Sequence, residues 1–380
     1  MKQSWQDFFA SKLQEKLDRN IYKTEITFDR TKFPIIKDIK TGKELISFSC
    51  NDYLGLSINM EVKDEVARTA LNIGVGASGS KFISGACNLL KIVENKTAKL
   101  KNTYDCVMYS SGYLANIGVF SALLNKGDAV FADRDIHASM IDGILLSGAK
   151  LFRYKHLDHE HLQSLIEKNA KNFDKICVAS ETVFSMSGDA DNVNKLKLIA
   201  KSNNAILITD DAHGFGVLPN QDENIDKNND VIEVKIGTYS KAVGAVGGYA
   251  CGSFEICEFL RNYSKSQIYN TSLPPCNLAG IAKSLEIISN TPSLQAKLID
   301  NMNFFCKELN IPIVSAAIIT LPFKDVTSCK LASQKLYDAG FFVKAVFPPT
   351  SNLPILRFTI SSLHAKGHIK AVCDILKHMV

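Results

Sequence analysis

The sequence predicts an α/β fold, with a large domain built on a mostly parallel sheet and a smaller α+β domain after it. Between about residues 60 and 210, patterns typical of helices alternate with short apolar runs typical of buried strands. The dipeptide Pro274-Pro275 interrupts this alternation, and mixed helical and strand patterns follow. We therefore expect an N-terminal helix and extended arm over residues 1–45, the large domain over 46–275 and the small domain over 276–380.

The individual elements follow from hydrophobic periodicity, taken in chain order. The arm begins with a predicted helix at about 5–19 and includes an extended segment at 44–49. The alternating region is predicted to contain helix 61–73, helix 89–101, strand 105–110, helix 114–124, strand 129–133, helix 140–147, strand 175–180, helix 192–202 and strand 205–210. After the proline pair we expect a long helix, segments 311–321, 333–339, 341–347 and 355–361, and a final helix from about His364.

The composition is that of a soluble globular protein, with 46% hydrophobic and 22% charged residues. No apolar run is long enough to span a membrane, and the first residues lack the apolar core of a secretory signal. The net charge of +5 is not gathered into a basic stripe, which argues against nucleic acid as a partner. The ten cysteines are scattered without a CxxC pair, so we expect no metal site, no disulfides and a cytoplasmic protein.

Chemically useful side chains follow the predicted strands at their carboxyl ends, where ligands bind in open α/β sheets. One buried run ends in Asp210, and a Ser- and Gly-rich turn further on carries Lys241. The segments 110–113 and 133–137 and the residue Ser185 follow other strands. A carboxylate that keeps a pyridine nitrogen protonated and a lysine that forms a Schiff base are what pyridoxal phosphate (PLP) requires. The pattern therefore predicts PLP as the cofactor.

Three other patterns suggest different chemistry, and each lacks its structural context. The segment 74–79 matches GxGxxG, but a predicted helix precedes it where dinucleotide binding needs a strand. The three histidines of 156–161 do not have the spacing of zinc ligands, so a solvated surface turn is predicted there. His364 and His368 are interpreted as polar residues at the start of a helix. No GxSxG elbow follows a strand, which argues against a serine hydrolase.

With these residues in view, the chain resembles the α-oxoamine synthases, a PLP-dependent group of the fold type I (aminotransferase) superfamily. The likeness runs from about Trp5 to the C-terminus, and its motifs are specific in combination. They are SCNDYLGL at 49–56, GSKFISG at 79–85, SGYLAN at 111–116, DRDIHAS at 133–139, VFSMSGD at 183–189, DDAHGFG at 210–216 and TYSK at 238–241. The resemblance implies a fold type I architecture and an acyltransferase that releases carbon dioxide.

The resemblance also implies a role for each residue around the cofactor ring. Lys241 is expected to form the Schiff base and then to serve as acid and base at the amino-acid Cα. Asp210 is expected to pair with the pyridinium nitrogen, and His213 to hydrogen-bond the phenolic oxygen. His137 is expected to stack on the ring, and Ser185 to contact its side.

The cofactor phosphate is expected to lie between two subunits of a homodimer. Backbone N–H groups of Gly112 and Tyr113 at a helix start are expected to bind it, together with Thr238. Thr271 and Ser272 resemble residues that reach the phosphate of the neighbouring subunit, which implies shared active sites.

The substrates are implied at the level of one branch of the family. Asn51 and Arg357 are expected to hold the amino-acid carboxylate. The Asp210-Asp211 pair and the compact length are most similar to members that condense L-alanine with a pimeloyl thioester, carried by coenzyme A or by an acyl carrier protein. Members that use glycine are the alternative, although one of them usually carries Asp-Glu at the same place.

At residues 219–222 the chain reads PNQD, where Gly-Arg-Gly is usual in the family, and four single positions also depart from the family pattern. Lys81 stands where arginine is common, Leu90 where histidine is frequent, Ser187 in place of a common aspartate and Ile355 in place of a frequent arginine. None of the four belongs to the expected cofactor set, so they leave the contacts of the acyl substrate open.

Overall fold

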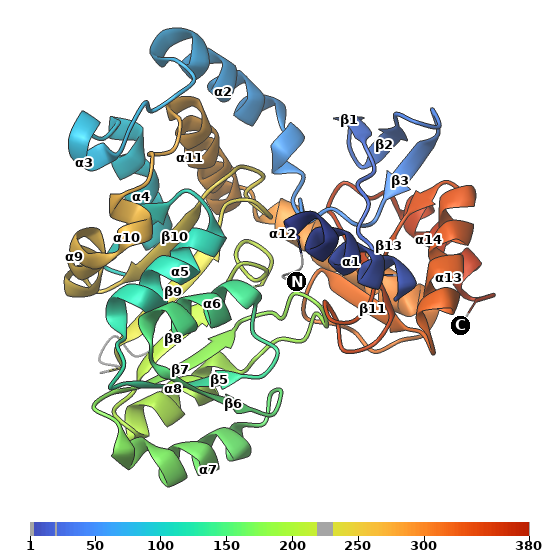
Figure 1. Ribbon diagram of the computed structural model, residues 1–380. Coiled ribbons are helices and arrows are strands. Elements are labelled where there is room, and N and C mark those ends of the chain that lie inside the picture. The colour runs from blue at the N-terminus through green and yellow to red at the C-terminus, as the bar shows by residue number, and fades with distance from the viewer. Residues whose placement is uncertain (1–3, 20, 219–230, 380) are drawn as a thin grey trace.

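The computed structural model describes residues 4–19, 21–218 and 231–379. A seven-stranded sheet lies at the centre of the larger part of the molecule (Figure 1), in the order β4-β10-β9-β8-β7-β5-β6. Neighbouring strands from β9 to β6 are parallel, and β10 is antiparallel to both its neighbours. The strands are β4 (Asp105–Tyr109), β5 (Ala129–Asp133), β6 (Lys150–Tyr154), β7 (Ile176–Glu181), β8 (Ile206–Asp210), β9 (Glu233–Thr238) and β10 (Gly248–Gly252).

Helices cover both faces of this sheet, which explains why its strands are apolar almost throughout. On one face α5, α6 and α9 pack against alternate strand residues such as Val130 and Ala132. On the other face α7 and α8 pack against Phe131, and α4 and α11 pack near Cys106. The helices of this part are α2 (Met60–Ile73), α3 (Lys81–Ser84), α4 (Asn88–Leu100), α5 (Gly112–Leu123), α6 (Ala138–Ser147), α7 (His159–Asn169), α8 (Val193–Ser202), α9 (Phe254–Tyr263), α10 (Lys265–Ile268) and α11 (Pro275–Asn290).

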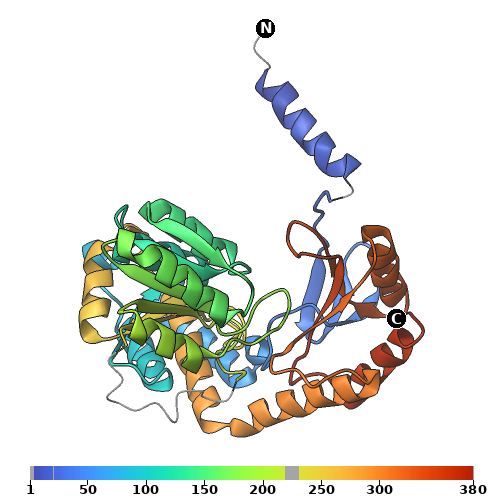
Figure 2. The ribbon, with the colours of Figure 1, turned by 90° about the horizontal axis from the view of Figure 1, so that it is seen from below.

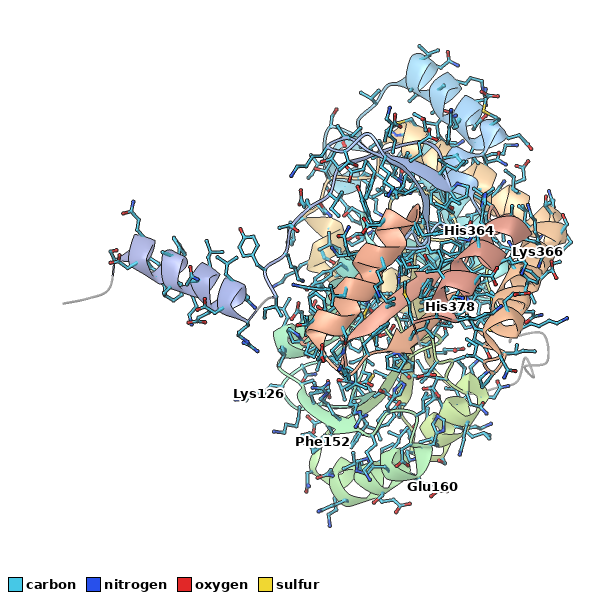
Figure 3. The ribbon with its side chains drawn as sticks, turned by 90° about the vertical axis from the view of Figure 1, so that its right-hand side faces the viewer. Lys126, Phe152, Glu160, His364, Lys366 and His378 are labelled. Atoms are coloured by element: carbon cyan, nitrogen blue, oxygen red, sulfur yellow. The ribbon has the colours of Figure 1, made fainter. Side chains whose placement is uncertain are left out.

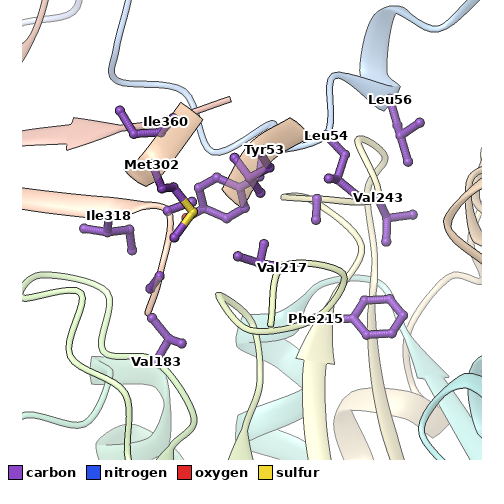
Figure 4. Close-up of a cluster of buried hydrophobic side chains, with 14 of the residues drawn as sticks. Tyr53, Leu54, Leu56, Val183, Phe215, Val217, Val243, Met302, Ile318 and Ile360 are labelled. Atoms are coloured by element: carbon purple, nitrogen blue, oxygen red, sulfur yellow. The ribbon is translucent and has the colours of Figure 1, made fainter. Parts of the chain in front are cut away.

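The C-terminal part holds an antiparallel sheet of order β11-β14-β13 with helices beside it. Its elements are α12 (Pro292–Leu309), β11 (Ile318–Pro322), α13 (Val326–Asp338), β13 (Lys344–Val346), β14 (Ile355–Thr359) and α14 (Lys366–Leu376). The predicted division at residue 275 remains a prediction. The first helix beyond it, α11, packs against α2 and α4 of the larger part, and residues from both parts share one hydrophobic cluster, in which Tyr53 and Phe215 accompany Met302 and Ile318 (Figure 4).

The N-terminal arm contributes a third sheet of order β1-β2-β3-β12. Its strands are β1 (Phe28–Lys32), β2 (Ile35–Asp38), β3 (Glu44–Ser47) and β12 (Phe341–Phe342). The pair β3 and β12 is parallel, with Ile46 opposite Phe341. The arm is therefore fastened to the C-terminal part of the chain. The sequence predicted an extended arm here but no partner for it.

Helix α1 (Trp5–Asp18) contains no buried residue and projects from the rest of the molecule in Figures 2 and 3. Ser4 caps its first turn, where the side chain accepts a hydrogen bond from the backbone of Asp7 at 3.1 Å. The helix predicted at 5–19 is thus present, and its aromatic side chains are exposed. Within the described residues, none of the helices is both long and apolar enough to cross a membrane.

His364 directly precedes Ala365, the N-cap of α14, and His368 is the third residue of that helix, so both lie at a helix start as predicted, but His364 is a buried core residue. The side chain is 1% exposed and stacks on Phe48 with ring centroids 4.1 Å apart. Its Nε2 lies 2.9 Å from the carbonyl oxygen of Ser47, and burial lowers its pKa to about 4. His364, labelled in Figure 3, is therefore a neutral core residue that joins the C-terminal part to the end of β3.

Candidate active site

The carboxyl ends of the parallel strands bring the predicted chemical groups to one edge of the large sheet. Asp210 ends β8 and Glu181 ends β7, and the two residues lie opposite each other in the strand register. Thr238 ends the next strand, β9, and Lys241 follows it on the turn that leads to β10. This is the edge at which the sequence predicted a ligand.

A chain of side chains links the predicted lysine to the predicted arginine. The amine of Lys241 lies 2.6 Å from Nε2 of His213, and Nδ1 of His213 lies 2.7 Å from the hydroxyl of Tyr53. That hydroxyl donates to Oδ1 of Asn51 at 3.2 Å. The same oxygen accepts from Nη1 and Nη2 of Arg357 at 3.3 Å. Each contact is a donor–acceptor pair when neutral His213 carries its proton on Nδ1.

Burial sets the protonation states of Lys241 and His213 in this series of hydrogen-bonded side chains. It lowers the pKa of Lys241 to about 8, against the opposing effect of the Asp210 charge. Burial also holds the pKa of His213 well below its ordinary value, and the charges of Lys241 and Arg357 lower it further. A neutral imidazole thus faces an amine that can lose its proton near neutral pH, as a nucleophilic or basic lysine requires.

Asp210 is held by two donors that fix its carboxylate in place. Oδ2 accepts from Nδ2 of Asn116 at 2.7 Å, and Oδ1 accepts from the backbone N–H of Ala212 at 2.9 Å. Nδ2 of Asn116 also donates to Oγ of Ser139, which lies 2.7 Å from Nδ1 of His137. Because the side chain of Asp210 is 5% exposed, its charge acts in a region of low dielectric constant.

The N-terminus of α5 lies beside the end of β9. Ser111 caps the helix by accepting from the backbone N–H of Leu114 at 3.2 Å. Gly112 and Tyr113 begin the helix, so their N–H groups have no carbonyl partner within it. A Cβ atom at Gly112 would lie 3.0 Å from Cβ of Thr238, so glycine lets the two segments approach closely. Such a helix start is suited to binding a phosphate.

His137 and Ser185 are the remaining residues that were predicted to lie around the cofactor ring. His137 is the N-cap of α6, and its ring meets that of Tyr113 edge to face, with centroids 6.2 Å apart. The backbone carbonyl of Ser185 accepts from Nε of Arg357 at 2.7 Å. Arg357 belongs to β14, so the site combines residues of both parts of the chain.

Thr271 and Ser272 do not belong to the hydrogen-bonded chain around Lys241. The backbone N–H of Ser272 donates to the carbonyl oxygen of Gly79 at 3.0 Å, and Thr271 is exposed. Gly79 closes the GxGxxG match, and helix α2 precedes this match, as the sequence predicted. The expected role of Thr271 and Ser272 toward a neighbouring subunit stays a prediction.

Sequence reasoning missed three residues of the site: Tyr53, Asn116 and Glu181. Glu181 is 2% exposed, its Oε1 has no hydrogen-bond partner among the described residues, and burial together with the Asp210 charge raises its pKa. A glutamate that ends an apolar strand beside Asp210 was the available signal. Tyr53 and Asn116 lie inside the motifs at 49–56 and 111–116, but only their long-range contacts reveal what they do.

The histidines of 156–161 do not form the solvated turn that was predicted. His156 lies 3.0 Å from Oδ1 of Asp133 and 3.3 Å from Oδ2 of Asp189, and its ring packs against Phe184. Nε2 of His159 lies 2.8 Å from Oδ1 of Asp191. These two partly buried rings join the segment that leads into α7 to the end of β5 and to the loop after β7, which the spacing of the histidines could not indicate.

The departure at residues 219–222 lies outside the described residues, and the four single-residue departures are not part of the hydrogen-bonded chain around Lys241. Lys81 lies 3.9 Å from Glu94, and burial lowers its pKa. Leu90 and Ile355 are buried, and the carbonyl oxygen of Ser187 accepts from the hydroxyl of Thr320 at 3.5 Å. Each is therefore accommodated by packing or by a local contact.

The low pKa of Lys241 leads to a measurable pH dependence. Only the neutral amine attacks an aldehyde, so we expect cofactor-free protein to recombine with PLP faster as the pH rises through about 8, and to level off above it. Below that value the rate should fall roughly tenfold per pH unit. Stopped-flow absorbance between pH 6.5 and 9.5 measures this profile. A rate that is still rising tenfold per pH unit at pH 9.5 would place the amine near the pKa of an exposed lysine.

Comparisons with known proteins give the following similarities. Residues 43–376 match the model of the family "Aminotransferase class I and II". A relative from Acidiphilium cryptum and one from Methanococcus aeolicus, each named "Putative 8-amino-7-oxononanoate synthase", are both 37% identical to the chain. The first match covers 89% of this chain and 88% of the relative, and the second covers 96% of each.

Solved structures are similar over most of the chain. Serine palmitoyltransferase from S. paucimobilis, solved with bound PLP and myriocin, is 25% identical with a TM-score of 0.90, over 98% of this chain and 96% of that one. An 8-amino-7-oxononanoate synthase from Francisella tularensis is 30% identical with a TM-score of 0.74, over 88% of this chain and 97% of that one.

Proposed function

Because the chain belongs to the class I and II aminotransferase family and, within it, to the PLP-dependent α-oxoamine synthases, we propose that it is an 8-amino-7-oxononanoate synthase. The proposed reaction joins L-alanine to a pimeloyl thioester of coenzyme A or acyl carrier protein, with loss of carbon dioxide, in biotin biosynthesis. The two relatives at 37% identity support this assignment within the family. The observation that carries it is the chain of contacts from Lys241 through His213 to Arg357.

The donor set of the site fits PLP. Asp210 supplies a buried carboxylate for the pyridine nitrogen, and Lys241 supplies the amine for the aldehyde. The start of α5 at Gly112, beside Thr238, supplies free N–H groups for the phosphate. When bound, PLP draws electron density from the amino-acid Cα and so makes its proton acidic.

The residues around the cofactor have distinct proposed tasks. Arg357 and Asn51 bind the carboxylate of L-alanine, because a guanidinium offers two parallel donors to it. Lys241 removes the proton from Cα through Nζ, and its pKa of about 8 suits that work near neutral pH. His213 is proposed to hydrogen-bond the phenolic oxygen of PLP, and His137 to cover one face of the ring. The backbone carbonyl of Ser185 accepts a hydrogen bond from Arg357 and so holds the arginine in place.

The substrate assignment is tested by comparing pairs of amino acid and thioester. We expect kcat/KM for L-alanine with pimeloyl-CoA to exceed that for glycine with acetyl-CoA by more than roughly 200-fold, the most that one methyl group can supply. The part of the kcat/KM ratio beyond 200-fold comes from the methylene groups of the acyl chain, each of which contributes about 0.8 kcal/mol when buried. Glycine with succinyl-CoA and L-serine with palmitoyl-CoA complete the set. Comparable or higher efficiency with any of these pairs would contradict the biotin assignment and leave the family assignment standing.

We also propose a homodimer with shared sites, in which Thr271 and Ser272 of one subunit contact the cofactor phosphate of the other. Protein with Lys241→Ala and protein with Thr271→Ala and Ser272→Ala are expected to form mixed dimers. In those dimers one of the two sites carries both defects and the other carries neither. Mixing should therefore restore part of the condensation activity that each variant lacks. Sedimentation shows whether dimers form, and an active monomer would exclude this arrangement.

A cytoplasmic location is proposed from the cysteines. All ten are free, and seven of them are buried, as expected of a protein from a reducing compartment.

A further inference from the structure

Arg357, the proposed carboxylate clamp, depends on the loop after β7 for the direction of its side chain. Its backbone is fixed in β14, between β11 and β13. Its guanidinium donates from Nε to the backbone carbonyl of Ser185 at 2.7 Å, and from both Nη atoms to Oδ1 of Asn51 at 3.3 Å. A shift of Ser185 would therefore change the direction of the guanidinium, and small misplacements of a binding group lower its efficiency.

The segment 183–190, which we call the clamp loop, carries Ser185. Its two end residues pair in an isolated β-bridge. Inside it, the N–H groups of Phe184 and Gly188 donate to the carbonyl oxygens of Asp189 and Phe184, each at 2.9 Å. These bonds give the loop its own shape. Where the loop lies relative to Arg357 depends on the side chains that contact it from other segments.

His156, which follows β6, makes such a contact. Its ring meets that of Phe184 edge to face with centroids 4.4 Å apart, and its Nε2 lies 3.3 Å from Oδ2 of Asp189. On the opposite side of the ring, Nδ1 lies 3.0 Å from Oδ1 of Asp133, a buried residue that ends β5. One side chain therefore joins a fixed strand end to the two residues that flank the turn presenting Ser185.

The two carboxylates favour the charged form of His156. Each ring nitrogen faces a carboxylate oxygen, and the ring can donate to both only when both nitrogens carry a proton. Burial opposes this charge, but the hydrogen bond and the charge of Asp133, aided by Asp189, raise the pKa of His156 above its ordinary value. The contact with Asp189 is therefore charge-assisted, which makes it stronger than the contact of a neutral ring.

The backbone next to His156 adopts a costly conformation that supports this bridge. Leu157 has a φ of 55°, in the left-handed region that residues with a side chain seldom occupy. Its N–H donates to Oδ2 of Asp133 at 2.8 Å, so one carboxylate holds both the turn and the ring. Costly backbone conformations of this kind cluster at functional sites.

We propose that His156 is a positioning residue for amino-acid binding, which holds the clamp loop so that Ser185 keeps the guanidinium of Arg357 in the direction that the substrate carboxylate requires. In this role His156 acts through the loop and does not need to touch the substrate. The inference rests on the proposed function for the role of Arg357 as the clamp. It adds a residue outside the site that controls the affinity for the amino acid.

The test measures the Kd of L-alanine from the absorbance change of bound PLP. We expect His156→Gln to raise this Kd roughly three- to tenfold, while the Kd of PLP and the KM of the thioester stay unchanged. A loss of folding stability alone would not divide the effects in this way. His156→Arg, which keeps a cation with several donors, should recover part of the affinity.

His159→Gln is the matched control. His159 forms a similar contact, with Nε2 at 2.8 Å from Oδ1 of Asp191. Asp191 is also held by the hydroxyl of Ser180 at 2.5 Å, so it should keep its place without the histidine. This variant should therefore retain the wild-type Kd for L-alanine.

Asp189→Asn tests the same bridge with little risk to folding, because the side chain of Asp189 is 51% exposed. It should weaken L-alanine binding to an extent similar to that of His156→Gln. Since the two side chains act through one contact, the double variant should bind little worse than either single variant. Losses that multiply in the double variant would show that the two residues act separately, and would overturn the inference.

Hydrogen exchange of the clamp loop gives a readout that needs no substrate. In protein without amino acid, exchange over 183–190 should be faster in His156→Gln and Asp189→Asn than in the wild-type protein or in His159→Gln. The inference is overturned if both variants keep the wild-type exchange and the wild-type Kd. It is also overturned if His159→Gln weakens amino-acid binding as much as His156→Gln does.

Titrations with glycine and L-serine beside L-alanine separate the two proposals. If the wild-type protein binds another amino acid best, the proposed function is contradicted. A loss of affinity for that amino acid in His156→Gln would still support the role of His156. If the affinity for the preferred amino acid is the same in His156→Gln as in the wild-type protein, the inference fails while the proposed function stands.

Discussion

Protein with Lys241→Ala is expected to bind PLP without a covalent link and to lose condensation activity by roughly 10⁴-fold or more. The loss combines two proposed roles of the same amine, which are to hold the cofactor and to move the Cα proton. The variant should fold, since Lys241 contributes a contact to His213 and no apolar core packing. Borohydride treatment followed by peptide mass spectrometry locates the link in the wild-type protein.

Lys265→Ala is the control for that experiment, because Lys265 is exposed on the short helix α10. This variant should keep both the link and the activity. Should borohydride still fix PLP to the Lys241→Ala protein, a different lysine carries the chemistry, and the assignment of the active site is wrong.

Substitution of two neighbouring aspartates by asparagine is expected to have opposite effects, one on activity and the other on stability. Asp210→Asn removes the charge that is proposed to face the pyridine nitrogen, and we expect activity to fall roughly 10²–10³-fold or more with little change in Tm. Asp211 instead contacts Lys101 at 2.5 Å and accepts from the hydroxyl of Thr182 at 2.6 Å. Asp211→Asn should lower the free energy of unfolding by roughly 3 kcal/mol, because it weakens a buried ion pair, while the cofactor spectrum stays unchanged.

Differential scanning fluorimetry, the PLP absorbance spectrum and steady-state kinetics on both variants separate these outcomes. If Asp210→Asn keeps full activity, its carboxylate does not hold the pyridine nitrogen. If Asp211→Asn changes the spectrum as Asp210→Asn does, the two residues share the task that is assigned here to Asp210.

The sequence predicted where a site residue lies when that depends only on the residues next to it in the chain. Asp210 follows an apolar run and Lys241 sits on a glycine-rich turn, so their places at the strand edge could be inferred from short segments. The partners of these groups could not be inferred in this way. Tyr53 lies far from His213 in sequence, and the link from Asn116 to Asp210 joins a helix to a strand.

Errors in the sequence interpretation have the same origin. His156 and His364 are polar residues in polar stretches, which favoured exposed positions for both. Each is instead held by groups from distant segments, His156 by Asp189 and His364 by Phe48. Burial depends on which segments meet, and a pattern of residue types along one segment does not determine that.

The parallel pairing of β3 with β12 has a consequence for the way the chain matures on the ribosome. Ile46 is translated about 300 residues before its partner Phe341. At ordinary rates of synthesis, roughly 5–20 residues per second, the β-strands of the arm wait about 15–60 s for the strand that completes their sheet. The hydrophobic cluster of Phe33 and Ile36, against which Phe342 packs, remains unfinished for the whole of that interval. The sheet of the N-terminal arm is thus completed near the end of translation, after the sheet that carries Asp210 has left the exit tunnel.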